Sequence, residues 1–140
     1  MKIIVDTSVW SLALRKKTLT ENEKRIVKEL RELIYEFRVV IIGSIRQELL
    51  SGISDETKFK NLRDKLKSFD DLPLDQKDYE KAAEISNICR RKGIQGSHID
   101  FLICATAVNR QISIFTTDKD FKNYSDVINL KLHSVRSEIK

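Results

Sequence analysis

The sequence predicts an α/β protein with a short, mostly parallel central sheet of four or five strands. Short β-branched runs alternate along the chain with longer segments of helical periodicity. Strands that alternate with helices form right-handed crossover units, which make the strands parallel. A chain of 140 residues has the length of one domain, which we expect to span residues 1–140.

Two apolar, β-branched runs in the first part of the chain, residues 2–5 and 39–42, indicate buried strands. A short helix is expected directly after the first of them, starting at Thr7 and Ser8. The clearest helix covers residues 20–37, because six of its apolar residues share one face. These are Ile26, Val27, Leu30, Leu33, Ile34 and Phe37.

Two further helices are expected after the second strand. Ser44 and Gln47 fit a capping box, which makes Ser44 the N-cap of the first of these helices. Residues 55–68 carry apolar side chains at helical spacing and predict the second. Residues 71–74 include the chain's one proline and indicate a connector or an edge strand.

The next two helices have clear start signals. Asp75 is expected to cap a helix over residues 76–92. Ser97 and Asp100 fit a capping box that opens a helix to about residue 110. Because this helix is apolar nearly all round, we expect it at the centre of the core.

The last part of the chain carries three weaker signals. Residues 112–115 indicate a strand, and residues 116–121 are expected to open a short helix. Residues 130–133 indicate a final strand. These segments complete the alternating pattern on which the fold prediction depends.

Acidic residues from separate segments converge on one edge of this predicted sheet. Asp6 follows the first strand directly, Glu48 lies one turn into the helix after the second strand, and Asp118 follows the strand at 112–115. Asp120 lies just beyond Asp118. The helix that carries Asp100 in its first turn must run antiparallel to the following strand, so Asp100 faces the same edge. Ligands of parallel α/β sheets bind at this edge.

Each acid also has a purely structural interpretation. Asp6 could cap the first helix, and Asp100 could serve only its capping box. Asp118 and Asp120 could be first-turn acids that the helix dipole favours, and Glu48 could be a solvated helix residue. Capping places acids at helix starts, and helix starts gather at this edge, so spacing alone leaves both interpretations open.

A cluster of carboxylates is tolerated when protons or cations neutralise it. Oxygen ligands favour Mg²⁺ or Mn²⁺, and the absence of His and Cys from the cluster disfavours zinc. Such a site suits two-metal hydrolysis of phosphodiester bonds, in which one ion activates water and the other stabilises the leaving oxygen.

The charge of the chain agrees with a polyanionic substrate. The formal net charge is +5, and the isoelectric point is about 9.2. Without the five acids at the edge, the rest of the chain would carry +10. Arg46, two residues before Glu48, is the expected phosphate contact.

The location of the protein follows from what its sequence lacks. No apolar run approaches the ~20 residues of a membrane span, and the N-terminal residues do not form a signal peptide. The two cysteines, Cys89 and Cys104, lie in helical patterns and are expected to be reduced core thiols. We therefore expect a cytoplasmic protein with no membrane partner.

Four stretches of the sequence resemble, in order and spacing, the motifs of PIN-domain nucleases. They are Val-Asp-Thr-Ser (5–8), Ser-Ile-Arg-Gln-Glu-Leu (44–49), Asp-Phe-Leu-Ile-Cys-Ala-Thr-Ala (100–107) and Thr-Thr-Asp-Lys-Asp-Phe (116–121). The chain is most similar to the VapC-type toxins of toxin–antitoxin pairs. This resemblance implies a three-layer α/β/α sandwich and a metal-dependent endoribonuclease.

The resemblance also implies roles for particular residues. Asp6, Glu48, Asp100 and Asp118 would be the catalytic acids that hold Mg²⁺ or Mn²⁺. Asp120 would be an accessory metal ligand, and Thr7 would position water or phosphate. The products would carry a 5′-phosphate and a 3′-hydroxyl. The implied partners are an RNA substrate, a second copy of the chain in a homodimer, and a small DNA-binding antitoxin that inhibits the site.

Other functions remain open from the sequence. The chain could be a non-catalytic RNA- or protein-binding module on the same scaffold, or a PIN nuclease that processes RNA. A phosphotransfer enzyme with an aspartyl-phosphate intermediate fits poorly. Haloacid-dehalogenase-like phosphatases carry a second Asp two residues after the first, where this chain has Ser8.

Overall fold

The structure is a computed structural model that describes residues 1–136. Its sheet consists of β1 (Ile3–Val5), β2 (Val39–Val40) and β3 (Ser113–Phe115), all parallel, in the order β2-β1-β3. The helices are α1 (Thr7–Leu14), α2 (Glu21–Tyr35), α3 (Gly43–Leu50), α4 (Glu56–Leu66), α5 (Gln76–Arg91), α6 (His98–Arg110) and α7 (Asp120–Ser125).

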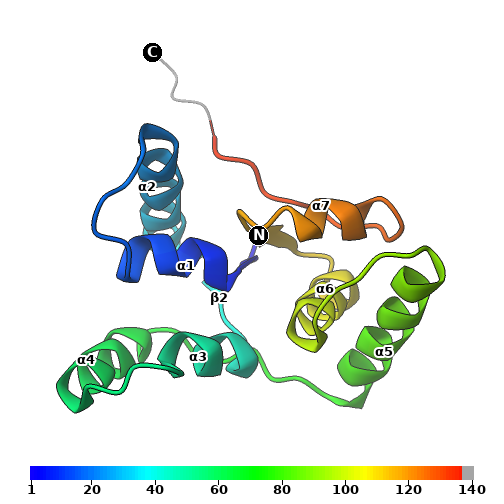
Figure 1. Ribbon diagram of the computed structural model, residues 1–140, viewed down its shortest axis with the longest axis horizontal. Helices are drawn as coiled ribbons and strands as arrows, with labels where there is room; N and C mark the ends of the chain where they lie inside the picture. The colour runs from blue at the N-terminus through cyan, green and yellow to red at the C-terminus, as the bar shows by residue number, and fades with distance from the viewer. Residues whose placement is uncertain (137–140) are drawn as a thin grey trace.

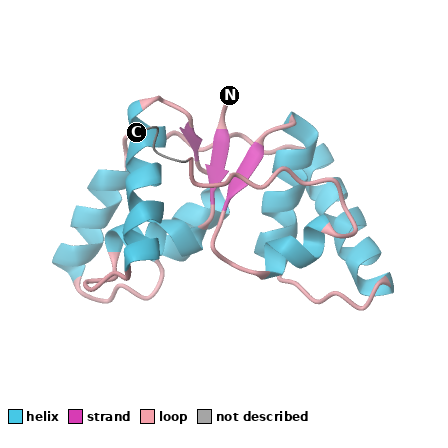
Figure 2. Cartoon of the chain, turned by 90° about the horizontal axis from the view of Figure 1, so that it is seen from above, coloured by secondary structure: helices cyan, strands magenta, loops and turns pink. Residues whose placement is uncertain are grey.

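Helices flank the sheet on both sides. Figure 1 shows α1 to α4 on the left of the strands and α5 to α7 on the right, and Figure 2 shows the strands between the two groups of helices. This arrangement confirms the predicted α/β class with a parallel central sheet.

The two outer strands that the sequence predicts are reduced to single bridges. Ile41 pairs with Asp71 on one side of the sheet, and Ile114 pairs with Leu132 on the other, both in parallel. The predicted segment at 71–74 cannot extend its pairing far, because Pro73 has no backbone N–H to donate. Within residues 1–136 the sheet therefore has three strands, where we expected four or five.

The start of α3 differs from the prediction. The helix begins at Gly43 with Ile42 as its N-cap, and no side chain caps it, so the predicted capping box of Ser44 and Gln47 is wrong. Only two residues separate the end of β2 from the start of the helix, and this places Ser44 inside the first turn. Its hydroxyl is buried and has no hydrogen-bond partner within residues 1–136.

The helix predicted over residues 20–37 is confirmed, but it ends two residues earlier than predicted. Thr20 and Glu23 form a reciprocal capping box at its start, and the last helical residue is Tyr35. Phe37, expected on the apolar face, is instead 84% exposed and has a φ of 58°. The chain reverses here to enter β2, so Phe37 lies in the turn and not on the helix.

Helix α6 lies at the centre of the core, as its sequence predicts. Six of its side chains are buried. The helix packs along α5 and next to β3. None of the helices within residues 1–136 is both long and apolar enough to span a bilayer.

Candidate functional site

Asp6 lies where β1 ends and is the N-cap of α1. Its side chain is buried, and Oδ2 accepts hydrogen bonds from the hydroxyls of Ser8 and Thr116, each at 2.8 Å. A longer bond of 3.4 Å comes from the backbone N–H of Ser8. Asp6 therefore performs the capping role that the sequence allowed, and neutral donors hold its carboxylate in place.

The same two hydroxyls connect Asp6 to the loop after β3. Ser8 Oγ accepts from the backbone N–H of Thr117 at 3.0 Å, and Thr116 Oγ1 accepts from that of Asp118 at 3.0 Å. Asp118 Oδ1 in turn accepts from the N–H of Asp120 at 2.9 Å. Helix α7 begins only at Asp120, so Asp118 lies in the loop and not in the first helical turn.

Asp100 lies in the first turn of α6, one turn after the N-cap Ser97. Its Oδ2 accepts a hydrogen bond of 2.7 Å from the hydroxyl of Tyr124 in α7. Burial raises the pKa of the Asp100 carboxyl above its ordinary value, and hydrogen bonds from Tyr124 and Ser97 oppose this rise. The negative charges of Asp6 and Asp118 raise the pKa further.

Asp100, Asp118 and Asp120 form a group in which each carboxylate has an oxygen within 4.8 Å of an oxygen of the others. Opposite ligands of one Mg²⁺ are about 4.2 Å apart, so this spacing is close to that of a cation site. The group consists of oxygen donors alone, which fits a hard divalent ion.

None of the ion pairs found within residues 1–136 includes Asp6, Asp100, Asp118 or Asp120. Carboxylates that lie this close repel one another unless a cation balances them. The acids therefore leave a concentration of negative charge at the carboxyl edge of the sheet.

Thr7 and Glu48, which were also predicted to belong to the site, lie outside the group of three carboxylates. Thr7 directly follows Asp6, and its Oγ1 is buried without a hydrogen-bond partner within residues 1–136. Glu48 is exposed on α3 and is not part of the three-carboxylate group.

Arg46, the expected phosphate contact, is engaged within the chain. Its Nε donates to Asp71 at 2.9 Å and its Nη1 to the carbonyl of Leu66 at 3.0 Å, while Nη2 donates to the carbonyl of Phe69. These bonds join α3 to the segment after α4. A phosphate would have to compete with all three of them.

Three residues of the site were not singled out by the sequence. Ser8 and Thr116 fall within the quoted motifs. Ser8 lies two positions after Asp6, and Thr116 lies two positions before Asp118, and a hydroxyl residue at this distance from an acid is a signal that could have identified them. Tyr124 has no such signal, because its acceptor Asp100 is 24 positions away.

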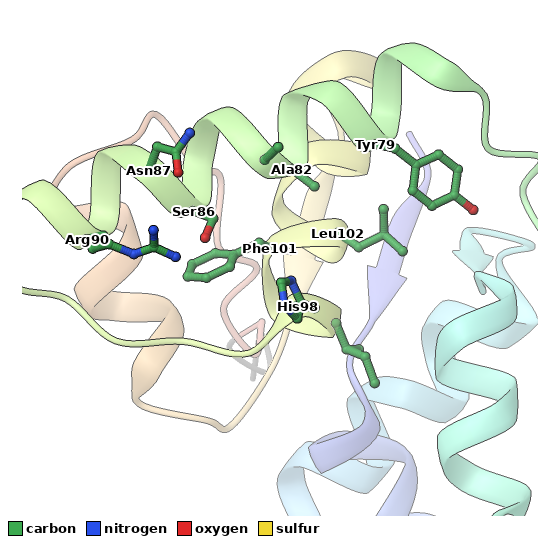
Figure 3. Close-up of a pocket in the computed structure, with 10 residues that line it drawn as sticks. Tyr79, Ala82, Ser86, Asn87, Arg90, His98, Phe101 and Leu102 are labelled. Atoms are coloured by element: carbon green, nitrogen blue, oxygen red, sulfur yellow. The ribbon is translucent and has the colours of Figure 1, made fainter.

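A hollow of about 410 Å³ lies between α5 and α6, next to the residues that flank Asp100. Figure 3 shows Phe101, Leu102 and His98 of α6 facing Tyr79, Ser86 and Arg90 of α5. The lining is mostly apolar, and Arg90 brings a cationic group to it.

Solved structures of similar fold include FitAcB, VapBC2 and one described as a toxin–antitoxin complex. FitAcB from Neisseria gonorrhoeae is 25% identical, with a TM-score of 0.74 over 94% of this chain and 96% of that chain. VapBC2 from Rickettsia felis, bound to a DNA fragment from its promoter, is 18% identical, with a TM-score of 0.75 over 95% and 98%. A toxin–antitoxin complex from Klebsiella pneumoniae is 16% identical, with a TM-score of 0.64 over 91% and 97%.

Two further comparisons concern the curated proteins and the protein families. No match was found among the curated proteins compared. The model of the PIN domain matches residues 3–127, which include Asp6, Asp100, Asp118 and Asp120. The chain therefore belongs to the PIN domain family, whose members are generally nucleases.

Proposed function

We propose that this protein is a divalent-metal-dependent endoribonuclease, the toxin of a VapC-type toxin–antitoxin pair. The observation that carries this proposal is the group of Asp100, Asp118 and Asp120, whose carboxylate oxygens lie within 4.8 Å of one another. Membership of the PIN domain family and the likeness to toxin–antitoxin structures support it.

Mg²⁺ or Mn²⁺ would be held by Asp100, Asp118 and Asp120, with Asp6 close enough to raise the pKa of Asp100 through its charge. Bound divalent ions would supply the two-metal chemistry of phosphodiester hydrolysis, by lowering the pKa of the attacking water and stabilising the leaving oxygen. The chain's own contribution is to hold its acids in place, through Ser8 and Thr116 for Asp6.

Glu48 belongs to the proposed acidic set as the contribution of α3. It is exposed, and it lies outside the group of closely spaced oxygens. We propose that Glu48 contacts the bound metal ion through a water molecule or through the substrate. A Glu48→Gln variant should then lose activity while retaining most of its affinity for the metal ion.

RNA is the proposed substrate because the charge of the chain favours a polyanion. The net charge is +5 even with all acids ionised, and bound cations would make it more positive. Arg90 at the hollow beside α6 and Lys119 between two of the acids are candidates for contacts with phosphate. Arg46, which is already bonded within the chain, is a weaker one.

The test is cleavage of defined RNAs by the purified protein with Mg²⁺ or Mn²⁺, followed by analysis of the product ends. The wild type should leave 5′-phosphate and 3′-hydroxyl ends, and EDTA should stop cleavage reversibly. Asp118→Asn should reduce cleavage by about a thousandfold or more, because several kcal/mol of stabilisation by the metal would be lost.

The matched control is Asp126→Asn, which removes an exposed acid at the end of α7, outside the group. It should cleave like the wild type. RNA binding without cleavage by the wild type would instead indicate a non-catalytic binding module. Cleavage that persists in EDTA would contradict the metal mechanism.

The proposed partners can be tested separately. We propose an antitoxin that occludes the acidic edge and a homodimer of this chain in the cytoplasm. Co-expression with the product of the neighbouring gene should yield a complex without ribonuclease activity, and sedimentation should give twice the mass of the chain. A monomer that is active alone would contradict only the dimer.

A further inference from the structure

Tyr124 is a fully buried phenol whose only described hydrogen bond is to an acid of the site. Its hydroxyl donates to Asp100 Oδ2 at 2.7 Å. Its ring packs against Phe101 and Phe121, with centroids 5.3 Å away in both cases. Two aromatic neighbours in different elements fix the direction in which the hydroxyl points.

The loop before α6 is shaped around this hydroxyl. A Cβ at Gly96 would lie 2.5 Å from the Tyr124 hydroxyl oxygen and 2.6 Å from Cζ of Phe101. Real Cβ atoms do not approach other atoms so closely, so any larger residue would displace the phenol or the loop. Glycine at position 96 is therefore required for the hydroxyl to reach Asp100.

We propose that Tyr124, seated against Gly96, is a positioning residue that orients the Asp100 carboxylate for a divalent ion. This inference rests on the proposed function, since it concerns the same site. A carboxylate on an otherwise rotatable side chain gains a fixed plane when a rigid donor holds one of its oxygens. Outer partners of this kind commonly set the affinity of a metal site.

A phenol proton suits this task better than a cationic donor. The Tyr124 hydroxyl donates its proton to Asp100, and a tyrosine hydroxyl, whose ordinary pKa is about 10, keeps this proton at neutral pH. It therefore steers Asp100 without neutralising the negative charge that attracts the ion. A Lys or Arg at this place would hold the carboxylate but would repel the ion.

The test compares Tyr124→Phe, which keeps the ring and removes the hydroxyl, with Tyr79→Phe, the same change at a mostly exposed tyrosine. Binding of Mn²⁺ to the metal-free chain is measured by titration calorimetry. Tyr124→Phe should bind Mn²⁺ about tenfold more weakly, and Tyr79→Phe should bind like the wild type. Thermal unfolding checks that both variants are folded.

A second pair of variants tests whether the close packing of Gly96 against the Tyr124 hydroxyl is needed. Gly96→Ala should weaken Mn²⁺ binding in the same direction as Tyr124→Phe. Gly43→Ala is its control, because a Cβ there would meet its nearest atom at an ordinary 3.6 Å. If Tyr124→Phe fails to fold, this pair decides the question.

The possible outcomes separate this inference from the proposed function. Unchanged or tighter Mn²⁺ binding by Tyr124→Phe, with RNA cleavage by the wild type, overturns only the role of Tyr124. Weaker binding by Tyr124→Phe in a protein that cleaves no RNA supports the role of Tyr124 and contradicts the ribonuclease. Absence of Mn²⁺ binding by the wild type overturns both.

Discussion

The two ends of α6 hold their charged side chains in opposite ways. At the C-terminal end, Arg110 donates to both oxygens of buried Asp78, at 2.6 Å and 3.0 Å. At the N-terminal end, Asp100 faces Asp118 and Asp120, and its described hydrogen bonds come from neutral groups. Helix α6 thus carries at one end an arginine that is paired with an acid of α5, and at the other end an acid that lies among other acids.

The difference shows which acids are available for chemistry. The Arg110 guanidinium holds the pKa of Asp78 far below its ordinary value, so this carboxylate is charged and already satisfied. Burial and neighbouring charges shift the pKa of Asp100 in the opposite direction. A buried acid whose pKa is raised among other acids is a candidate for binding a cation.

The largest effect is expected from substitutions at the acidic end. Asp100→Asn should abolish metal-dependent cleavage, by about a thousandfold or more, without loss of stability. Because the folded-state pKa of Asp100 is raised, its ionisation destabilises the metal-free chain as pH rises. The variant should therefore unfold at the same or a higher temperature at neutral pH, with an advantage that shrinks as pH falls. Unfolding of the variant at room temperature would show that Asp100 serves only as a cap.

At the basic end of α6, a substitution is expected to lower stability. Arg110→Met should lower the free energy of unfolding by about 3 kcal/mol at neutral pH, because it leaves Asp78 as a buried unpaired charge. The folded-state pKa of Asp78 is depressed, so the stabilisation is present above its ordinary value of 3.8 and is lost as pH falls below it. Urea unfolding at neutral pH and near pH 3 should show the gap between variant and wild type narrow. Equal gaps at both pH values would contradict this account.

Addition of Mg²⁺ should stabilise the folded chain through the acidic end of α6 and not through the basic end. At a hundred times its dissociation constant, a bound ion stabilises the folded chain by about 2.7 kcal/mol. This increment should appear in the wild type and in Arg110→Met, and it should vanish in Asp118→Asn. Thermal unfolding with Mg²⁺ and then with excess EDTA measures it.

The smallest effect concerns the neutral donors that hold the acids. Thr116→Val removes the hydroxyl that donates to Asp6, and it should lower the free energy of unfolding by about 1 kcal/mol. Thr116→Ser keeps the hydroxyl and should be close to the wild type. A loss as large as that of Arg110→Met would mean that the acidic edge contributes to stability as much as the ion pair does.

The sequence was informative where local signals coincide with the geometry of a parallel sheet. Asp6 and Asp118 follow strands, and Asp100 follows a helix start, so the parallel topology alone directs all three to one edge. The mostly apolar sequence of α6 likewise predicted its central place in the core.

The rest depends on contacts that carry no local signature. The acceptors of Arg46 include two backbone carbonyls, which any residue could supply, so its internal bonds could not be expected from the sequence. Tyr124 meets Asp100 only because α7 folds back over the start of α6. The failed capping box at Ser44 shows that a motif match is overruled when the preceding strand ends too close to it.

The site draws on both ends of the chain, since Asp6 follows the first strand and Asp120 begins the last helix. A ribosome making this protein therefore releases the last acid only after most of the polypeptide has been synthesised. Nascent and prematurely terminated chains that stop before Asp118 lack part of the acidic group. A chain of this kind would therefore lack part of the proposed metal site until nearly all of it has been made.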